Sequence, residues 1–187
     1  MAAALTVVST TVMAQTSYPW MDTSKSFRER AELLCRELTL REKVDQLGNN
    51  VSEPIKRDGQ VILPSYQYWN EALHGVARSG AATSFPESKG MSATWDEMLV
   101  RACAEAISDE ARIYHETKGK GLNYWSPTIN MARDPRWGRE EENYGEDPLL
   151  AGRLAVEFIK GFQGEITPAT PYYKFVACAM HFAANNY

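Results

Sequence analysis

The alternation of strand and helix patterns in the second half of the chain most constrains its fold. Residues 122–125 form a short apolar run that predicts a strand. A helix pattern over residues 148–163 opens with Asp147 as the N-cap and Pro148 in the first turn. Residues 175–179 form a continuous apolar run, as expected of a parallel strand buried on both faces. Strand, loop, helix and strand in this order are the unit of an α/β fold.

Two shorter helices are predicted between Ser26 and Gly48. The first has an apolar stripe at helical spacing, formed by Phe27, Ala31, Leu34 and Leu38. Thr39 and Glu42 then fit a reciprocal capping box that starts the second helix. The expected buried face of that helix consists of Leu40, Val44 and Leu47. Residues 49–60 are polar and predict a loop.

A longer helix is predicted between Thr94 and Gly119, with Thr94 and Glu97 as its capping box. Its expected apolar face is formed by Trp95, Leu99, Ala102, Ala106 and Tyr114. His115 suits the negative end of the helix dipole, so we give it no chemical role. His74, earlier in the chain, is also expected to be structural.

The composition narrows the classes of function. The 187-residue chain is long enough for one globular core, and its net charge of −4 offers no basic face for nucleic acid. Cys35, Cys103 and Cys178 are odd in number and far apart, and we interpret them as small buried apolar residues. The sequence has no CxxC or HExxH spacing, so neither a metal nor another cofactor is predicted.

Residues 1–16 are interpreted as the remnant of a secretory signal. Residues 2–14 are small and apolar, and residues 12–14 supply small side chains around a cleavage site. A basic segment before them is missing, so a plain disordered tail is the alternative. The apolar run is too short for a membrane span. The signal predicts a secreted or periplasmic protein. Residues 17–187 are expected to form part of one domain.

A charged loop is predicted over residues 130–148, where neither helical nor strand periodicity fits the apolar positions. Arg139 follows Trp137 and Gly138, and a glycine turn there would aim its guanidinium at a polyol or a carboxylate. In the alternative interpretation, the arginines of this loop pair with nearby acids and only stabilise the loop. These arginines are Arg133, Arg136 and Arg139. Spacing alone favours the second interpretation.

Three sequence blocks carry a resemblance to a known family. Residues 133–148 read Arg-Asp-Pro-Arg-Trp-Gly-Arg and then, after two glutamates, Glu-Asn-Tyr-Gly-Glu-Asp-Pro. Residues 68–77 read Tyr-Trp-Asn-Glu-Ala-Leu-His-Gly-Val-Ala, and residues 178–183 read Cys-Ala-Met-His-Phe-Ala. In this order and spacing the blocks resemble glycoside hydrolase family 3, in particular its β-xylosidase and β-glucosidase branch. The resemblance extends from about residue 38 to the last residue.

The resemblance implies a (β/α)8 TIM-barrel-like catalytic domain, which agrees with the α/β pattern. A complete barrel typically needs about 250 residues, so we expect this chain to form the first, incomplete part of such a domain. The family hydrolyses glycosidic bonds with retention, which requires two carboxyl groups. Its nucleophile lies on a later strand and its acid/base later still or in a second domain. No catalytic residue is therefore predicted within this chain, and the missing C-terminal part of the enzyme is an expected partner.

By the same resemblance, Glu71, Arg139 and His181 match positions that bind sugar hydroxyls in the −1 subsite. An isolated glutamate among apolar residues needs a partner, and Arg78, a backbone amide or sugar hydroxyls would each serve Glu71. Many glucosidases of the family carry aspartate at this position, whereas xylosidase-like members carry glutamate, which favours a pentose. The family normally has a lysine at the fourth hydroxyl-binding position, where this chain has Met180.

The leading functional prediction is β-1,4-xylosidase activity on xylo-oligosaccharides, from the non-reducing end and with retention. β-Glucosidase activity on gluco-oligosaccharides is the nearest alternative, and an α-arabinofuranosidase side activity fits the same branch. An alternative of another class is a non-catalytic carbohydrate-binding or degenerate remnant. Met180 and the missing nucleophile would favour that alternative.

The methionine at position 180 generates a prediction. The substitution Met180→Lys in a full-length enzyme should raise kcat/KM for an aryl β-xyloside, because an ammonium group adds donors that a thioether lacks. Steady-state kinetics of the two enzymes measure the effect. An unchanged kcat/KM would show that this position does not limit sugar binding.

Overall fold

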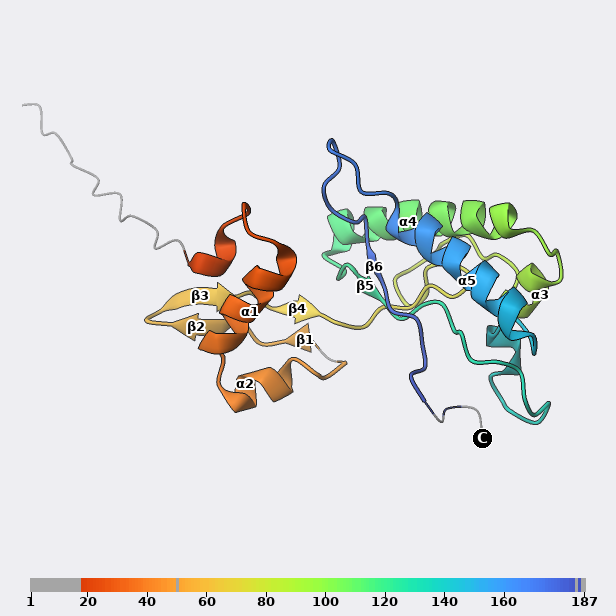
Figure 1. Cartoon of the computed structure of the whole chain (residues 1–187), viewed down its shortest axis with the longest axis horizontal. Coiled ribbons are helices and arrows are strands. Elements are labelled where there is room, and N and C mark those ends of the chain that lie inside the picture. Colours follow the sequence, from red (N-terminus) through yellow and green to blue (C-terminus); the bar gives the residue numbers. More distant parts are fainter. Residues whose placement is uncertain (1–17, 50, 184, 186–187) are drawn as a thin grey trace, which may run out of the picture.

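The computed structural model describes residues 18–49, 51–183 and 185. The predicted signal remnant, residues 1–16, lies outside the described residues. Figure 1 shows an N-terminal part of short helices and strands and a larger part dominated by two long helices. An extended stretch of chain joins the two parts.

The N-terminal part is built from short elements. Their bounds are Pro19–Met21 for the 3-10 helix η1, Phe27–Glu37 for α1, Leu40–Asp45 for α2, Val51–Ser52 for β1, Ile55–Arg57 for β2, Gln60–Leu63 for β3 and Tyr66–Gln67 for β4. β2 and β3 form an antiparallel hairpin, and β1 pairs with β4. Both helices begin as predicted, because Ser26 with Glu29 and Thr39 with Glu42 form complete capping boxes.

The β2–β3 hairpin shows that the prediction of a polar loop over residues 49–60 is wrong. Its turn is Asp58-Gly59, with φ angles of 48° and 81°. Positive φ at both central residues is what a two-residue type I′ hairpin requires, and Asp-Gly is a common sequence for it. The hairpin contributes to a small apolar core formed by Trp20, Leu38, Ile55 and Ile62.

The predicted buried face of α2 is also wrong. Leu40 is 78% exposed, Leu47 is 85% exposed, and Val44 is exposed as well. The helix ends at Asp45, so Leu47 lies beyond it. Leu40, Val44 and Leu47 do not belong to the small core, to which α1 and the hairpin contribute instead. The helical spacing is therefore real, but the burial inferred from it is not.

The two strands predicted in the second half of the chain are present and pair in parallel. They are β5 (Asn123–Tyr124) and β6 (Val176–Ala177). A parallel bridge between Thr128 and Met180 continues this pairing beyond the strands.

The segment that follows β4 runs along the other side of β5. The side-chain amide of Asn123 donates to the Tyr68 carbonyl at 2.6 Å, and the Trp125 amide donates to the Asn70 carbonyl at 2.9 Å. Both partners advance together along the chain, so this segment is parallel to β5. Three segments that are distant in sequence therefore lie side by side with the same direction.

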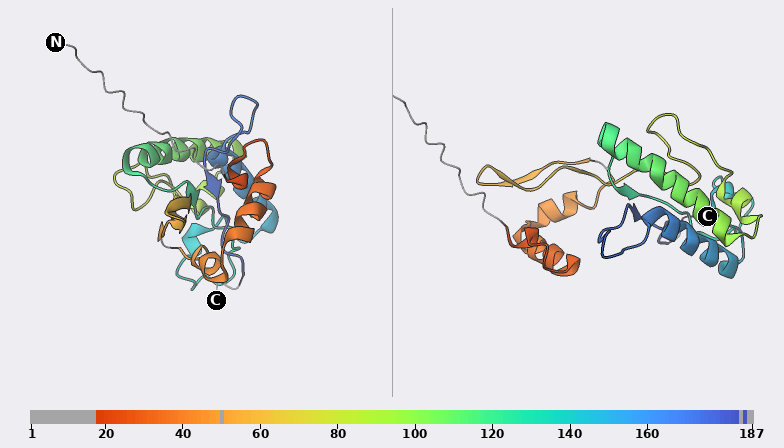
Figure 2. Two further views of the ribbon diagram at one scale, coloured as in Figure 1. Left: turned by 90° about the vertical axis from the view of Figure 1, so that its left-hand side faces the viewer. Right: turned by 90° about the horizontal axis from the view of Figure 1, so that it is seen from above.

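Helices complete the larger part of the molecule. They are α3 (Ser88–Ser92), α4 (Glu97–Lys118) and α5 (Pro148–Gln163), and α4 and α5 lie against each other beside β5 and β6 (Figures 1 and 2). As predicted, Asp147 caps α5, and Pro148 occupies its first turn. The main core includes Val100, Ala104, Ile107, Ala111, Tyr124, Leu154, Phe158, Phe162 and Phe175. Helices and strands thus share one core, which holds the strands in place.

The start and the buried face of α4 differ from the prediction. Its N-cap is Asp96, whose carboxylate accepts from the Leu99 amide, so Thr94 and Trp95 precede the helix. Trp95 has a φ of 57° and an exposed side chain. The buried stripe is Val100, Ala104, Ile107, Ser108 and Ala111. The predicted stripe and the buried stripe lie about one residue apart in this helix, and both fit helical periodicity. Packing against α5 determines which of them is buried.

Only one face of β6 is buried among the described residues. Phe175 is 1% exposed, whereas Val176 is 50% exposed and Cys178 is exposed. The prediction of a strand buried on both faces is wrong here, because the described elements cover the side toward the helices alone. Cys35 is also exposed, so the interpretation of the cysteines as buried is wrong for Cys35 and Cys178, and Cys103 is only half-buried.

The close approach of α4 and α5 generates a prediction from two glycines of the same helix. A Cβ on Gly161 would lie 2.4 Å from the Arg101 carbonyl oxygen, whereas a Cβ on Gly152 would meet nothing within 4 Å. Gly161→Ala should lower the free energy of unfolding by about 1–3 kcal/mol through overpacking. Gly152→Ala should raise it by about 0.4–1 kcal/mol, because alanine is the better helix former. Urea unfolding measures both, and equal effects would contradict the observed helix packing.

Candidate functional site

The predicted site residues follow the carboxyl ends of the three parallel segments. Glu71 comes directly after the segment beside β5, and Asn130 opens the loop after β5. His181 follows Met180, where the pairing of β6 ends. Parallel strands place their carboxyl ends at one edge, so the loops that carry these residues are gathered there.

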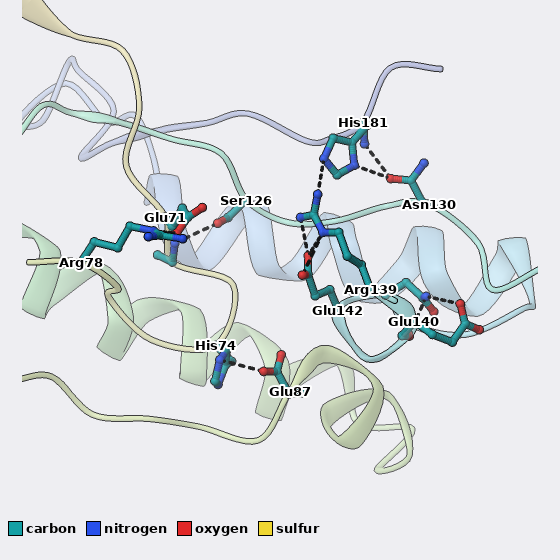
Figure 3. A network of polar contacts seen from close by, with 12 residues as sticks. Glu71, His74, Arg78, Glu87, Ser126, Asn130, Arg139, Glu140, Glu142 and His181 are labelled. Carbon is teal, nitrogen blue, oxygen red and sulfur yellow. Dashed lines mark hydrogen bonds and ion pairs between the residues drawn. The ribbon is translucent and has the colours of Figure 1, made fainter. Parts of the chain in front are cut away.

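The block around Glu71 is fixed to its neighbours by hydrogen bonds. The Asn70 side chain donates to the Asn123 carbonyl at 2.9 Å, and the Ala72 amide donates to Ser126 Oγ at 3.1 Å. The Glu71 carboxylate pairs with Arg78 Nε at 2.5 Å (Figure 3). Arg78, one of the partners that the sequence offers to Glu71, is therefore in place. It compensates the charge of a side chain that is only partly exposed.

His74 behaves as a structural residue. Its Nδ1 lies 2.8 Å from the Phe85 carbonyl oxygen, and its Nε2 lies 3.0 Å from a Glu87 carboxylate oxygen. Both ring nitrogens are thus engaged within the protein. The same holds in part for His115, whose Nδ1 contacts the Lys120 carbonyl at 2.6 Å.

The charged loop is folded around a buried asparagine. The Asn143 side chain donates to the Glu140 carbonyl at 2.7 Å and accepts from the Gly145 amide at 2.8 Å. This places the 3-10 helix η2 (Glu140–Glu142) directly after Arg139. The loop prediction is therefore confirmed apart from this single turn.

Arg139 has one partner within the loop and one outside it. Its Nε donates to both carboxylate oxygens of Glu142 at 2.9 Å, and its Nη1 lies 3.1 Å from His181 Nε2 (Figure 3). Arg136 pairs with Asp134 within the loop. The interpretation of loop stabilisation thus fits Arg136, whereas Arg139 also connects the loop to the end of β6.

Electrostatics favour a neutral imidazole beside a charged guanidinium. Partial burial lowers the pKa of His181, and the positive charge of Arg139 lowers it further. The pKa of Arg139 is raised, mainly by its hydrogen bonds to Glu142, and the Glu71 carboxylate also contributes. Arg139 therefore interacts electrostatically with both Glu71 and His181.

Met180 is buried where the resemblance would place an ammonium group. The residue is 9% exposed, and its backbone is fixed by hydrogen bonds to Pro127 and Ile129. The Met180 amide donates to the Pro127 carbonyl at 3.0 Å, and its carbonyl accepts from the Ile129 amide at 2.7 Å. A thioether has no hydrogen to donate, so this position supplies packing rather than a bond to a hydroxyl.

Two residues of the site were not singled out from the sequence. Glu142 holds the Arg139 guanidinium, and Asn130 contacts both the backbone and the ring of His181. The position of Asn130 just after a strand end was the available signal. Across the described ranges, no group of three or more His, Cys, Asp or Glu side chains is placed to hold a metal ion, and no helix is long and apolar enough to cross a membrane.

Comparison with known proteins assigns the family. A family model described as the glycosyl hydrolase family 3 N terminal domain matches residues 34–186. The chain belongs to glycoside hydrolase family 3. The resemblance carried by the three sequence blocks is thereby confirmed.

Curated relatives of this family 3 chain include named xylosidases. The exo-1,4-β-xylosidase bxlB of Emericella nidulans is 42% identical over 177 residues, which cover 89% of this chain and 22% of that protein. The β-xylosidase/α-L-arabinofuranosidase 1 of Medicago sativa subsp. varia is 39% identical over 178 residues, which cover 90% and 22%. The chain spans about a fifth of the length of these relatives.

Solved structures agree on the fold. The family 3 exo-β-xylosidase XlnD, in complex with a xylobiose aziridine activity-based probe, matches with a TM-score of 0.75 and 36% identity over 90% of this chain and 22% of that one. A β-glucosidase involved in saponin metabolism from intestinal bacteria matches with a TM-score of 0.55 and 35% identity over 68% and 16%. The predicted fold class, the first part of a TIM-barrel-like α/β domain, is confirmed.

The environment of His181 generates a prediction for stability. Its pKa is lower in the folded chain than the usual 6.5, so the unfolded chain takes up this proton first as the pH falls. The free energy of unfolding should therefore decrease as the pH falls from about 7.5 through about 6.5, by at most about 1.4 kcal/mol per pH unit for one proton.

The variant His181→Gln provides the control, because it removes this proton and should flatten the pH dependence of urea unfolding. Carboxyls with lowered pKa, such as Asp134, stay ionised in both states over this range and do not contribute. An identical slope in the variant would contradict the proposed neutral state of His181.

Proposed function

We propose that this chain forms the N-terminal portion of the catalytic barrel of a retaining exo-acting β-1,4-xylosidase. The observation that carries the proposal is that Arg139 interacts with both Glu71 and His181, which follow the carboxyl ends of parallel segments. In barrel enzymes this end of the strands carries the active site. Relatives named as xylosidases support the substrate class.

The three side chains offer complementary groups to a sugar ring. The Glu71 carboxylate accepts hydrogen bonds from hydroxyl groups, and the Arg139 guanidinium donates them. His181, when neutral, adds either a donor or an acceptor. Such charge-assisted contacts orient the sugar and strengthen as charge develops on the ring in the transition state.

The length of the Glu71 side chain supports a pentose rather than a hexose. Compared with aspartate, glutamate extends one methylene further toward the space where a hexose carries its exocyclic CH₂OH group. One methylene changes specificity by about 1–3 kcal/mol. β-Glucosidase activity is the second candidate, because a solved β-glucosidase is 35% identical over 68% of this chain.

We assign the described residues to substrate binding and not to bond cleavage. Two of the loop carboxylates are already paired: Glu142 with Arg139, and Glu140 with Lys89 at 3.3 Å. The nucleophile and the acid/base would come from the C-terminal part of the enzyme. Export to the periplasm or the extracellular medium remains part of the proposal and rests on the composition of residues 1–16.

Glu71→Asp tests the substrate assignment in the enzyme that combines this chain with the rest of the family barrel. The wild type should hydrolyse an aryl β-xyloside with higher kcat/KM than an aryl β-glucoside. The variant should lower this ratio by about tenfold or more, because it opens space for the hexose CH₂OH group. Steady-state kinetics with both substrates measure the ratio.

Glu32→Asp is a matched control, since Glu32 forms an exposed ion pair with Arg28 on α1. It should leave both substrates unaffected. A wild type that prefers the glucoside would favour the β-glucosidase assignment. A ratio that is equal in wild type and Glu71→Asp would remove Glu71 from the specificity argument.

A further inference from the structure

The imidazole of His181 is held by protein groups on both of its nitrogens. Nδ1 lies 2.9 Å from Asn130 Oδ1, and Nε2 lies 3.1 Å from Arg139 Nη1. Figure 3 shows the ring between these two side chains, which belong to the loop after β5. The ring itself follows β6, so two neighbouring units of the fold meet at this histidine.

The backbone of His181 determines which atom of Asn130 faces it. The His181 amide donates to Asn130 Oδ1 at 2.8 Å. A backbone N–H can only donate, so the atom that it meets must be the amide oxygen and not the nitrogen. The same oxygen faces His181 Nδ1, and an oxygen without hydrogen can only accept. Nδ1 must therefore carry the hydrogen of the ring.

The other side of the ring leads to the same tautomer independently. A guanidinium has donors and no acceptor, so Arg139 Nη1 requires a lone pair on His181 Nε2. Glu142 holds this guanidinium through its Nε and Nη2, which keeps Nη1 turned toward the ring. A ring protonated on Nε2 would set two donors against each other at 3.1 Å.

We propose that Asn130 is a positioning residue that holds His181 in the neutral tautomer with hydrogen on Nδ1, so that Nε2 faces the sugar site as an acceptor beside the Arg139 donors. The role in sugar recognition rests on the proposed function, whereas the tautomer does not. The single lone pair of His181 Nε2 accepts from Arg139 Nη1 in this structure. A substrate hydroxyl therefore takes the place of that N–H as the donor to Nε2, and its oxygen accepts from the Arg139 guanidinium in turn. The site then recognises one hydroxyl through both its hydrogen and its oxygen.

The neutral amide is the side chain that suits this task. An aspartate at position 130 would also accept from Nδ1, but its charge would stabilise the imidazolium. The imidazolium would place a second N–H against Arg139. The charged groups that face the ring are Arg139 and Glu142, which are paired with each other, so the asparagine adds orientation without adding charge.

The 187-residue chain with ¹⁵N-labelled histidine tests the proposal directly by long-range ¹H–¹⁵N spectroscopy at about pH 7.5. His181→Gln assigns the resonances. His181 should show a protonated Nδ1 and an unprotonated Nε2. A protonated Nε2, in either the neutral ring or the imidazolium, would overturn the proposal.

Two variants separate the role of Asn130 from a general loss of structure. Asn130→Asp keeps the acceptor oxygen and should raise the titration midpoint of His181 by about one pH unit or more. Asn130→Leu removes the acceptor and should move the neutral ring toward the tautomer with hydrogen on Nε2. His74 and His115, which face carbonyl oxygens through Nδ1, are internal controls and should not change. An unchanged His181 tautomer in Asn130→Leu would contradict the positioning role.

Titration of these samples with methyl β-xyloside distinguishes the inference from the proposed function. Sugar-induced shifts at His181 in the wild type that weaken at least threefold in Asn130→Leu support both. The expected tautomer without any sugar response would reject the proposed sugar site and retain the positioning of the ring. Equal sugar responses in wild type and Asn130→Leu would reject the role of Asn130 and retain the sugar site.

Discussion

Parallel pairing between distant segments is the constraint on which the larger part of this structure depends. Neighbouring parallel strands cannot be joined by a tight turn, and each needs a long crossover connection. Here α4 lies in the connection between the segment after β4 and β5, and α5 lies in the connection between β5 and β6. The common direction of the three segments brings Glu71, Asn130 and His181 to one edge. The geometry of the site is thus a consequence of how the sheet is connected.

Local signals predicted the elements better than they predicted burial. The capping residues of α2 and α5 were correct, because a cap depends on a few neighbouring residues. The cap predicted at Thr94 was wrong, since α4 begins after Asp96. The buried face of α4 was predicted about one residue away from its observed position. Leu99 and Val100 both fit an apolar stripe, and only contact with α5 distinguishes them. The exposed side of Val176 had the same origin: a strand pattern does not say which faces receive a covering layer.

The candidate site shows a similar division. Glu71, Arg139 and His181 could be selected because their sequence blocks match a family, and Arg139 and His181 also follow predicted strands. The sequence did not predict that Arg139 contacts both Glu142 and His181, because these contacts depend on the turn that η2 makes. Asn130 resembles any asparagine at the start of a loop. Its role emerges only from a partner that lies 51 residues away in sequence.

This separation along the chain has a kinetic consequence. The pairing of β5 with β6 closes a loop that contains the whole charged segment and α5, and closing such a loop costs entropy before any contact compensates it. Helices form from local interactions, whereas non-local parallel pairing is intrinsically slow. The contact between Asn130 and His181 should therefore appear late in folding, together with the closure of the sheet. The ¹⁵N resonances of the His181 ring would therefore show when the native strand pairing has formed.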